Sequence, residues 1–482
     1  MPAVGRRLST VRLSVSNSPK YRRWLLVVTL TGIFCTSFPT GILSISIKAI
    51  AVDLHSTPST ITWVTTGPIL VAAVGMPLLG RVGDLHGHRV VFLAGMCTAG
   101  LFAVCTGFAW NATSLVAFRT TAQIGAAATV PSTFAMLFRA FPAHERVRAS
   151  SLASGSLSGA SVIGIVGGGP LIELFGWRPI FFIQAATAFV ALLPALLVLP
   201  TIEPVDERPR QDYAGAVLLA LGTFALTFGI NRLGVWGVTP VTAGCLAAVP
   251  VCGWLLIHVE RRAASPLLPL QVLSSRNIRL VVVASFLLNL GWLGNFIVTP
   301  LFLQSVLGLS LTYTALMTLP RTGSIVFASP FAGHLGVRYG ERRLLVVSCL
   351  GLSLVMVMLS ATAMVENLPA LIAVLSLSGL AFGAAAPALV SSVSESIAED
   401  DFGLAVSLQQ TASQIGAVVG ISLFSAIAAD ATTARPFAFV YLLTAGLALT
   451  TALLGLGLAR GSPAEVGQPS ARDLRTVPCP SE

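Results

Sequence analysis

The stretch "LGRVGDLHGHR", residues 79–89, places three charged residues, two histidines and three glycines between two long apolar runs. Only 10% of the 482 residues are charged, 55% are hydrophobic and the mean hydropathy is +0.85, whereas a soluble chain carries about 25% charged residues. Long uncharged runs are typical of segments that lie in lipid. The composition therefore predicts a polytopic membrane protein, in which residues 79–89 form a short polar loop between two spans.

The length of the apolar runs predicts the number of spans. A bilayer core requires about 20 apolar residues per helix, and fourteen runs reach that length. The expected fold is all-α, with two six-helix halves, 24–200 and 276–459, and a linker, 201–275, that holds two further transmembrane helices. The runs are 24–48, 61–80, 90–110, 115–138, 150–174, 178–199, 213–233, 238–258, 279–303, 312–333, 344–364, 368–391, 404–428 and 436–459.

The basic residues predict the orientation of these spans. The arm 1–23 holds six of the 29 Lys and Arg residues; with this arm in the cytoplasm, inside segments hold 23 and outside segments hold four. Such an excess follows the positive-inside rule, so both termini are expected in the cytoplasm and the protein in the cell membrane. The tail, 460–482, is rich in Pro, Ser and charge and is predicted to be disordered. The net charge of +10 has this topological cause, and without a basic domain no nucleic-acid partner is expected.

The opening loop has a second copy in the sequence, "GHLGVRYGER" at residues 333–342. Val337 stands in this copy where Asp84 stands in the first, so the two loops differ in charge. Parallel repeats are a transporter architecture with substrate bound between the halves. The matching residues, each 253 apart, are Gly80 with Gly333, Gly83 with Gly336, Gly87 with Gly340, and Arg89 with Arg342.

The first loop resembles motif A of the major facilitator superfamily, Gly-x-x-x-Asp-x-x-Gly-x-Arg. Fourteen spans are similar to the drug:proton antiporter branch of that family, and the resemblance covers roughly 24–460. It implies a multidrug efflux-type secondary transporter with a proton as coupling ion. Further matches in order along the chain are "ITWVTTGPIL" (61–70), "LVAFRTTAQIGAAA" (115–128), "GIVGGG" (164–169), "GWRPIFFI" (176–183), "ERRAASPLLPL" (260–270), "LFLQSVLGLS" (301–310) and "LPRTG" (319–323).

Three positions depart from the pattern of that branch. Pro39 stands where helix one usually carries an Asp, and Ile165 replaces the proline of motif C. In motif B, Gln123 is displaced by one position and Ala122 fills its place. These departures leave alternatives open. One is a facilitator or differently coupled transporter of another small metabolite, and the other is a non-transporting membrane sensor or scaffold.

The motif A residues are candidates for a conformational latch. A carboxylate at Asp84 can meet an arginine such as Arg89 and the positive N-terminal end of a neighbouring helix, holding one side of the transporter closed. Alternatively, the arginines only set the topology and the glycines only allow tight turns. An Asp framed by Gly80, Gly83 and Gly87 favours the latch.

Two arginines lie at membrane depth, where a charge costs about 3 kcal/mol or more and marks a functional site by default. Arg119 lies one helical turn from Gln123, and the resemblance implies a role for it near the proton path; the alternative is snorkelling to the outer interface. Arg321 lies deeper and is expected at the substrate or coupling site.

Polar stripes and glycines complete the candidate residues. The stripes are expected to line the substrate cavity, or alternatively to hydrogen-bond neighbouring helices. The motif C glycines are expected to let helices approach closely between the halves. The stripe candidates are Asn289, Trp292, Asn295, Gln410 and Gln414, and the motif C glycines are Gly164, Gly168 and Gly169.

The sequence carries no hydrolase, metalloprotease or P-loop motif. No enzymatic activity, cofactor or metal site is therefore expected, and His86 and His88 are interpreted as polar loop residues. Transport must then use an ion gradient or the gradient of the substrate. The expected function is efflux of drug-like or antibiotic-like molecules, hydrophobic or cationic, by a monomer whose other partners are the proton and the lipid bilayer.

Overall fold

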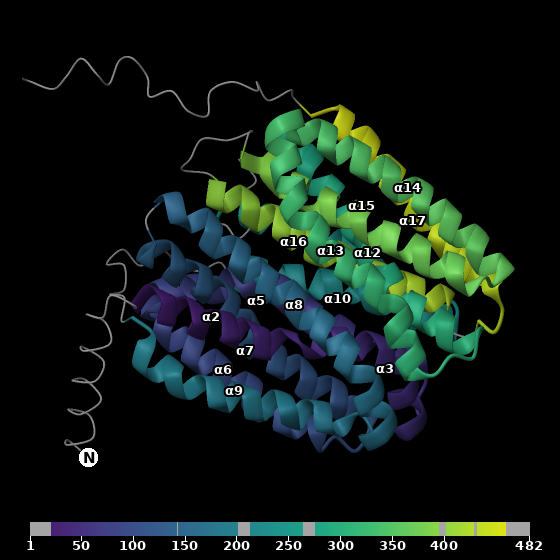
Figure 1. The fold of residues 1–482 in the computed structure, drawn as a ribbon, viewed down its shortest axis with the longest axis horizontal. Coiled ribbons are helices and arrows are strands. Elements are labelled where there is room, and N and C mark those ends of the chain that lie inside the picture. The colour runs from purple at the N-terminus through teal and green to yellow at the C-terminus, as the bar shows by residue number, and fades with distance from the viewer. Residues whose placement is uncertain are drawn as a thin grey trace, which may run out of the picture.

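The computed structural model describes residues 21–141, 143–200, 213–263, 275–394, 402–428 and 431–458, and in these ranges it consists of helices joined by turns and loops. The predicted arm up to residue 20 and the predicted tail 460–482 lie outside these ranges. Figure 1 shows two bundles side by side, the N-terminal one in purple and blue and the C-terminal one in green and yellow.

The helices follow one another in the order that the apolar runs predict. The N-terminal bundle holds α2 (Tyr21–Ser37), α3 (Pro39–Asp53), α4 (Pro58–Ile61), α5 (Trp63–His86), α6 (His88–Gly107), α7 (Ala112–Ala140), α8 (Ala143–Phe175) and α9 (Arg178–Val198). The linker forms α10 (Tyr213–Trp236) and α11 (Pro240–Glu260). The C-terminal bundle holds α12 (Arg276–Ser305), α13 (Leu311–Tyr339), α14 (Glu341–Val365), α15 (Leu368–Ser394), α16 (Phe402–Ile427) and α17 (Ala434–Leu456).

The two bundles pair their helices in the same way. α5 packs on α7 and α6 packs on both α7 and α9; correspondingly, α13 packs on α15 and α14 packs on α15 and α17. The bundles meet where α8 contacts α13, α16 contacts α5, and α12 contacts α3. In the described part of the chain, ten helices are long and apolar enough to cross a membrane. The molecule is therefore a multi-pass membrane protein made of two related helical bundles.

The first span is divided into two helices at the proline that replaces the expected acid. α2 ends at Ser37 and α3 begins at Pro39, whose ring nitrogen has no hydrogen to donate to the preceding turn. Phe38 between them keeps helical dihedral angles, φ −60° and ψ −30°, so the chain continues in nearly the same direction. Pro39 is buried, and this depth of the span therefore holds a helix break where a carboxylate was expected.

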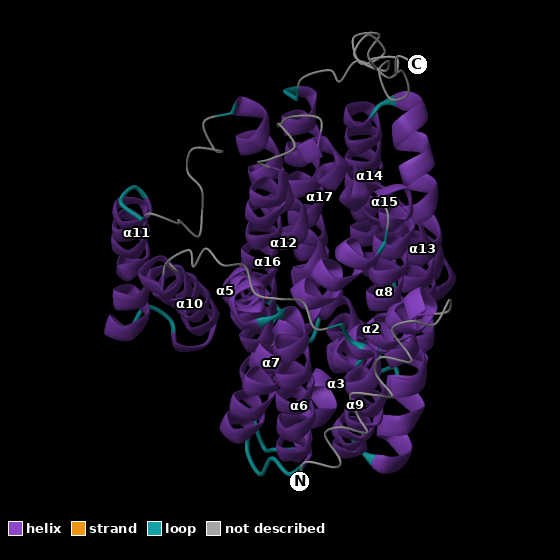
Figure 2. Cartoon of the chain, turned by 90° about the vertical axis from the view of Figure 1, so that its left-hand side faces the viewer, coloured by secondary structure: helices purple, strands orange, loops and turns teal. Residues whose placement is uncertain are grey.

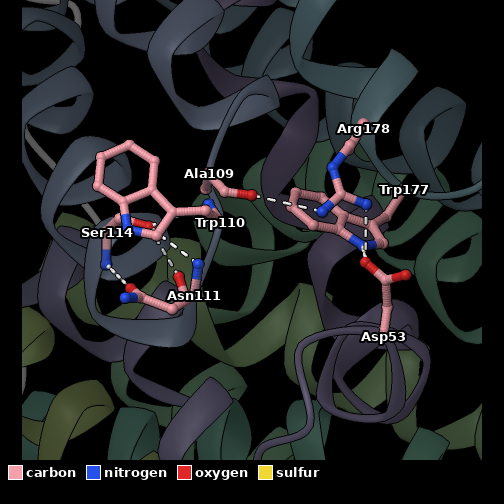
Figure 3. A network of polar contacts seen from close by, with 7 residues as sticks. All are labelled: Asp53, Ala109, Trp110, Asn111, Ser114, Trp177 and Arg178. Atoms are coloured by element: carbon pink, nitrogen blue, oxygen red, sulfur yellow. Dashed lines mark hydrogen bonds and ion pairs between the residues drawn. The ribbon is translucent and has the colours of Figure 1, made fainter.

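The rim of the N-terminal bundle is held by a polar network (Figure 3). Arg178, at the start of α9, pairs with Asp53 at the end of α3 at 2.7 Å, and the Trp177 indole donates to the same carboxylate at 3.0 Å. Arg178 also donates to the Ala109 carbonyl at 3.3 Å. One carboxylate thus joins α3 to α9, and one guanidinium joins α9 to the α6–α7 connection.

The linker helices lie to one side of the two bundles (Figure 2). α11 packs on α10, and α10 packs on α5 and α16, which belong to different bundles. Trp63 of α5 donates its indole hydrogen to Asn231 of α10 at 3.2 Å and lies against Phe224 and Phe228. α10 therefore contacts the seam between the bundles on one face.

Candidate functional site

The two glycine-rich loops have the same geometry. Gly87 ends α5 with φ 91°, and Gly340 ends α13 with φ 87°, a left-handed conformation that side chains rarely adopt. A Cβ on Gly83 would collide with the His88 imidazole, and a Cβ on Gly336 would lie 2.7 Å from the Glu341 carboxylate. In each loop one glycine makes the turn, and the other makes room for the first side chain of the next helix.

The loop arginines reach the same kind of acceptor in both bundles. Arg89 donates to the Leu196 carbonyl at the end of α9 at 2.6 Å, and Arg342 donates to the Leu456 carbonyl at the end of α17. A cation at the negative C-terminal end of a helix is favourable. The Asp84 side chain lies outside the part of the chain that the structure describes, so the latch to Asp84 stays a prediction.

Replacing Gly87 with alanine is expected to lower the free energy of unfolding by about 1 kcal/mol, because the left-handed conformation is strained for a residue with a Cβ. Gly351 is the matched control, since it lies in α14 at an ordinary φ with open space around it. Gly351→Ala is expected to be neutral or slightly stabilising. Chemical denaturation in detergent measures both; equal effects would contradict the role assigned to the turn.

A cavity of about 430 Å³ lies between the two bundles. Its volume is in the range of sites for drug-sized ligands. α3, α5 and α8 form its wall on the N-terminal side, and α12, α13, α15 and α16 form its wall on the C-terminal side. The described residues that line it are Gly41, Thr65, Ile69, Ser161, Asn289, Trp292, Leu293, Phe296, Ile297, Thr322, Ile325, Phe382, Gln414 and Ile421.

Three of the predicted stripe residues lie in this lining: Asn289, Trp292 and Gln414. The other polar groups in the wall are hydroxyls, and no described lining residue carries a charge. Trp292 stacks on Phe382, with ring centroids 4.0 Å apart and an angle of 4° between the planes. The cavity therefore combines an aromatic wall with neutral hydrogen-bonding groups, a composition that suits an amphipathic aromatic molecule.

Arg321 lies behind the aromatic wall. Its guanidinium carbon is 4.1 Å from the Trp292 ring centroid and 5.4 Å from that of Phe296, and the residue is only 1% exposed. Nη1 donates to the Thr299 hydroxyl at 3.3 Å, whereas Nε and Nη2 have no partner in the described part of the chain. The deep arginine of the sequence is thus a buried cation in contact with the cavity wall.

Asn295 lies away from the cavity, in a buried polar cluster behind it. It donates to the Met356 sulfur at 3.0 Å and accepts from the Thr299 hydroxyl at 2.6 Å. The Tyr441 hydroxyl reaches Thr299 at 3.5 Å. Thr299 and Asn295, both on α12, therefore connect Arg321 to α17 through Tyr441 and to α14 through Met356, and Asn295 contributes to this connection and not to the lining.

Three other predicted residues do not join the cavity. Arg119 is 2% exposed in α7, and its Nε and Nη1 have no partner among the described residues. Gln123 is half-buried one turn further along α7. Gln410 is exposed, while its neighbour Gln409 is buried and donates to Ser285 at 3.0 Å. Among the described glutamines of α16, Gln414 is the one that lines the cavity.

Polar contacts join the bundles at one end of the cavity; we call them the closure. Glu173 of α8 accepts from the Thr312 backbone N–H of α13 at 2.9 Å and from the Thr312 hydroxyl. Lys48 of α3 donates to the Gln304 carbonyl of α12 at 3.0 Å, and the Gln304 amide donates to the Ile45 carbonyl at 2.8 Å. None of these three residues is a site candidate in the sequence alone, although Gln304 is identifiable there as a lone amide in an apolar run.

The motif C glycines lie beside the closure and pack α8 between the bundles. A Cβ on Gly164 would meet the Phe38 carbonyl, and one on Gly168 would lie 2.9 Å from the Ile42 side chain, both in α2–α3. A Cβ on Gly169 would lie 3.0 Å from both Ala315 and the Leu311 carbonyl, in α13 of the other bundle. Gly167 has open space instead. Close approach of helices in lipid depends on such small residues.

The sequence profile of the Major Facilitator Superfamily matches residues 29–328 and 321–481. This match, the paired bundles and the cavity between them define the class: the chain belongs to the Major Facilitator Superfamily of membrane transporters and is not an enzyme. The fold predicted from the loop at residues 79–89 is thereby confirmed at the level of the family.

Two of the named relatives come from Streptomyces species. The chain is 29% identical over 452 residues to the lincomycin resistance protein of Streptomyces lincolnensis, covering 90% of this chain and 91% of that one. It is 29% identical over 332 residues to the tetracenomycin C resistance and export protein of Streptomyces glaucescens, covering 68% of this chain but only 62% of that relative's length. Among solved structures, the D-xylose–proton symporter is similar with a TM-score of 0.67 at 15% identity, over 92% of this chain and 98% of that one, which concerns the fold alone.

Proposed function

We propose that this protein exports drug-like or antibiotic-like small molecules across the cell membrane in exchange for protons. The observation that carries the proposal is the cavity of about 430 Å³ between the bundles, bounded at one end by the closure. Binding between two bundles that rock against each other is how this architecture transports. The names of the relatives, which concern resistance and export, support efflux as the direction.

The proposal includes the topology of the chain. Ten described helices meet the length and hydropathy of a span, and α5, α7, α8 and α13, each of 24 residues or more, supply four further candidates within the bundles. This supports fourteen spans, with the linker pair α10 and α11 beside the seam. The excess of Lys and Arg on one side supports cytoplasmic termini, which puts the closure on the outer face. We propose a monomer.

Proton coupling needs a group that changes its contacts on protonation. Pro39 removes the usual carboxylate from helix one. Glu173 supplies another, because its carboxylate accepts two hydrogen bonds from the opposite bundle. A protonated carboxyl loses its charge and so weakens both bonds, and outer acid would then favour opening of the closure. This supports antiport with a carboxylate at the outer rim.

Replacing Glu173 with glutamine is expected to open the closure partially. The glutamine is nearly isosteric but neutral, so the bonds to Thr312 lose their charge-assisted part, about 1 kcal/mol for an exposed pair. That shifts the ratio of closed to open molecules about fivefold. Spin labels on the exposed residues Phe175 and Tyr313, in a cysteine-free background, report the change as a longer and broader distance distribution. Glu366→Gln, at the exposed end of α14, is the control and is expected to change nothing.

The proposal is tested by flux in proteoliposomes that hold the purified protein. A hydrophobic fluorescent drug is expected to accumulate when a pH gradient is imposed, together with proton movement in the opposite direction. Flux that does not depend on the pH gradient would overturn proton coupling and indicate a facilitator instead. No flux with a panel of neutral, cationic and anionic compounds would overturn transport and favour a sensor or scaffold.

A further inference from the structure

The cavity between the bundles has a positive electrical character. The described lining residues are neutral, and the charge in contact with the wall is the guanidinium of Arg321, which lies behind Trp292. No carboxylate pairs with Arg321 in the described part of the chain, and its Nε and Nη2 have no hydrogen-bond partner there. An unpaired buried charge acts over several ångströms because water does not screen it.

Trp292 is not arranged to bind a cation. Phe382 stacks on its ring at 4.0 Å, and the guanidinium carbon of Arg321 lies 4.1 Å from the same centroid. Two groups this close cannot share one face of the indole, so each covers its own face. An aromatic ring attracts cations at its face and anions at its edge. With both faces covered, Trp292 presents its positive edge to the cavity.

The second arginine at membrane depth, Arg119 of α7, is also a buried charge without a paired carboxylate in the described ranges. α7 packs on α5, whose Thr65 and Ile69 line the cavity on the opposite side from Trp292. Unbalanced positive charge is therefore present in both bundles that enclose the cavity.

We infer that the preferred substrate is an amphipathic aromatic molecule that carries a negative charge, such as a carboxylate or an ionised phenol. The aromatic ring of this substrate lies against Phe296 and the edge of Trp292. Arg321 attracts its negative charge, and no described lining residue carries a negative charge that would repel it. The neutral donors Asn289 and Gln414 orient it. This inference adds the charge of the substrate to the proposed function and rests on that function. It differs from the expectation of a hydrophobic or cationic substrate.

The test measures binding to the full-length protein in nanodiscs of zwitterionic lipid, by calorimetry at about 0.15 M salt, where exposed charges are screened beyond ~8 Å. Three probes share one ring system and differ in charge: naphthalene-2-carboxylate, 2-naphthylmethanol and 2-naphthylmethylammonium. The carboxylate is expected to bind at least about tenfold tighter than the ammonium. A carboxylate affinity no tighter than that of the ammonium, including no detectable binding of either, overturns the inference.

Variants assign the preference to Arg321. Arg321→Met removes the charge and is expected to reduce the preference to about twofold or less, whereas Arg321→Lys is expected to retain most of it. Arg276→Met, at the exposed start of α12, removes one charge of the same sign far from Trp292 along the helix and is expected to change nothing. An unchanged affinity for the neutral alcohol shows that the cavity is intact. A preference that survives Arg321→Met in an intact cavity contradicts the assignment.

The two proposals fail separately in these experiments. Loss of the carboxylate preference with gradient-driven flux intact removes the inference on substrate charge and leaves the exporter. A carboxylate preference without flux of any compound removes the exporter and leaves an anion-selective binding site.

Discussion

Replacing Gly169 with leucine is expected to reduce export at least about fivefold, because the closure forms less readily. A single Cβ at this position already lies 3.0 Å from three atoms of α13 in the opposite bundle, and leucine adds three further carbons. Overpacking of this kind costs about 1–3 kcal/mol. That cost falls on the closed state alone, so the ratio of closed to open molecules drops roughly fivefold to 150-fold.

Gly167 is the matched control, because it lies two residues away on the same helix and has open space around its Cβ position. Gly167→Leu is expected to leave export within about twofold of the original protein, since the side chain meets no helix. Initial rates of drug efflux, normalised to the amount of folded transporter by gel filtration, give the comparison. Equal losses in the two variants would mean that the effect is general to α8 and not due to the contact with α13.

Replacing Trp292 with alanine is expected to weaken substrate binding at least about tenfold. The indole is 3% exposed, lies between Phe382 and Arg321, and forms part of the cavity wall. Truncation removes the aromatic surface for the ligand and leaves Arg321 without its cation–π partner. Trp292→Phe keeps a ring between the same two neighbours. It is expected to reduce the binding free energy by less than half as much as Trp292→Ala does.

The control for Trp292 is Trp254, which is 65% exposed on α11 and stacks on His258. Trp254→Ala is expected to leave affinity unchanged. Since truncation of a buried tryptophan also costs about 3–5 kcal/mol of stability, thermal unfolding of each variant must be measured beside ligand affinity. A folded Trp292→Ala protein with undiminished affinity would exclude the cavity as the substrate site.

The fold could be predicted from the sequence because the features that indicate it, apolar runs and glycine-rich turns, are local and recur along the chain. The apolar runs give the order of the helices, and the spacing of 253 residues between the two glycine-rich loops relates the bundles. Gly87 and Gly340 have matching positive φ angles for the same reason. A turn at a fixed place in a chain requires a particular residue, and such requirements are visible in one sequence.

Only part of the cavity lining could be predicted from the sequence. Asn289, Trp292 and Gln414 were identifiable as polar or amphipathic residues in apolar helices. Phe382 was not, because an aromatic residue in an apolar run has no distinguishing signal. Gln410 and Gln409 show the same limit: both lie in one span, and only the rotation of α16 in the bundle decides that the first is exposed and the second buried.

The contacts between bundles were the least predictable part. Glu173 meets Thr312 across 139 residues of sequence, and Lys48 meets Gln304 across 256. Pairing over such separations depends on how two bundles dock, which no spacing within one bundle encodes. The deep arginines were recognisable in the sequence because a charge in lipid is costly. The contact between the Trp292 ring and Arg321 was not predictable from the sequence and is known from the structure.

Transport by the proposed mechanism requires that one cavity faces the two sides of the membrane in turn. A cysteine at Ser161 in a cysteine-free background places a thiol in the cavity wall, and a membrane-impermeant thiol reagent is applied to inside-out and right-side-out vesicles. We predict labelling from the cytoplasmic side at rest, since the closure bounds the outer end, and labelling from the outer side as well when substrate and a pH gradient are supplied. A thiol that reacts from only one side under every condition would contradict alternating access at this cavity.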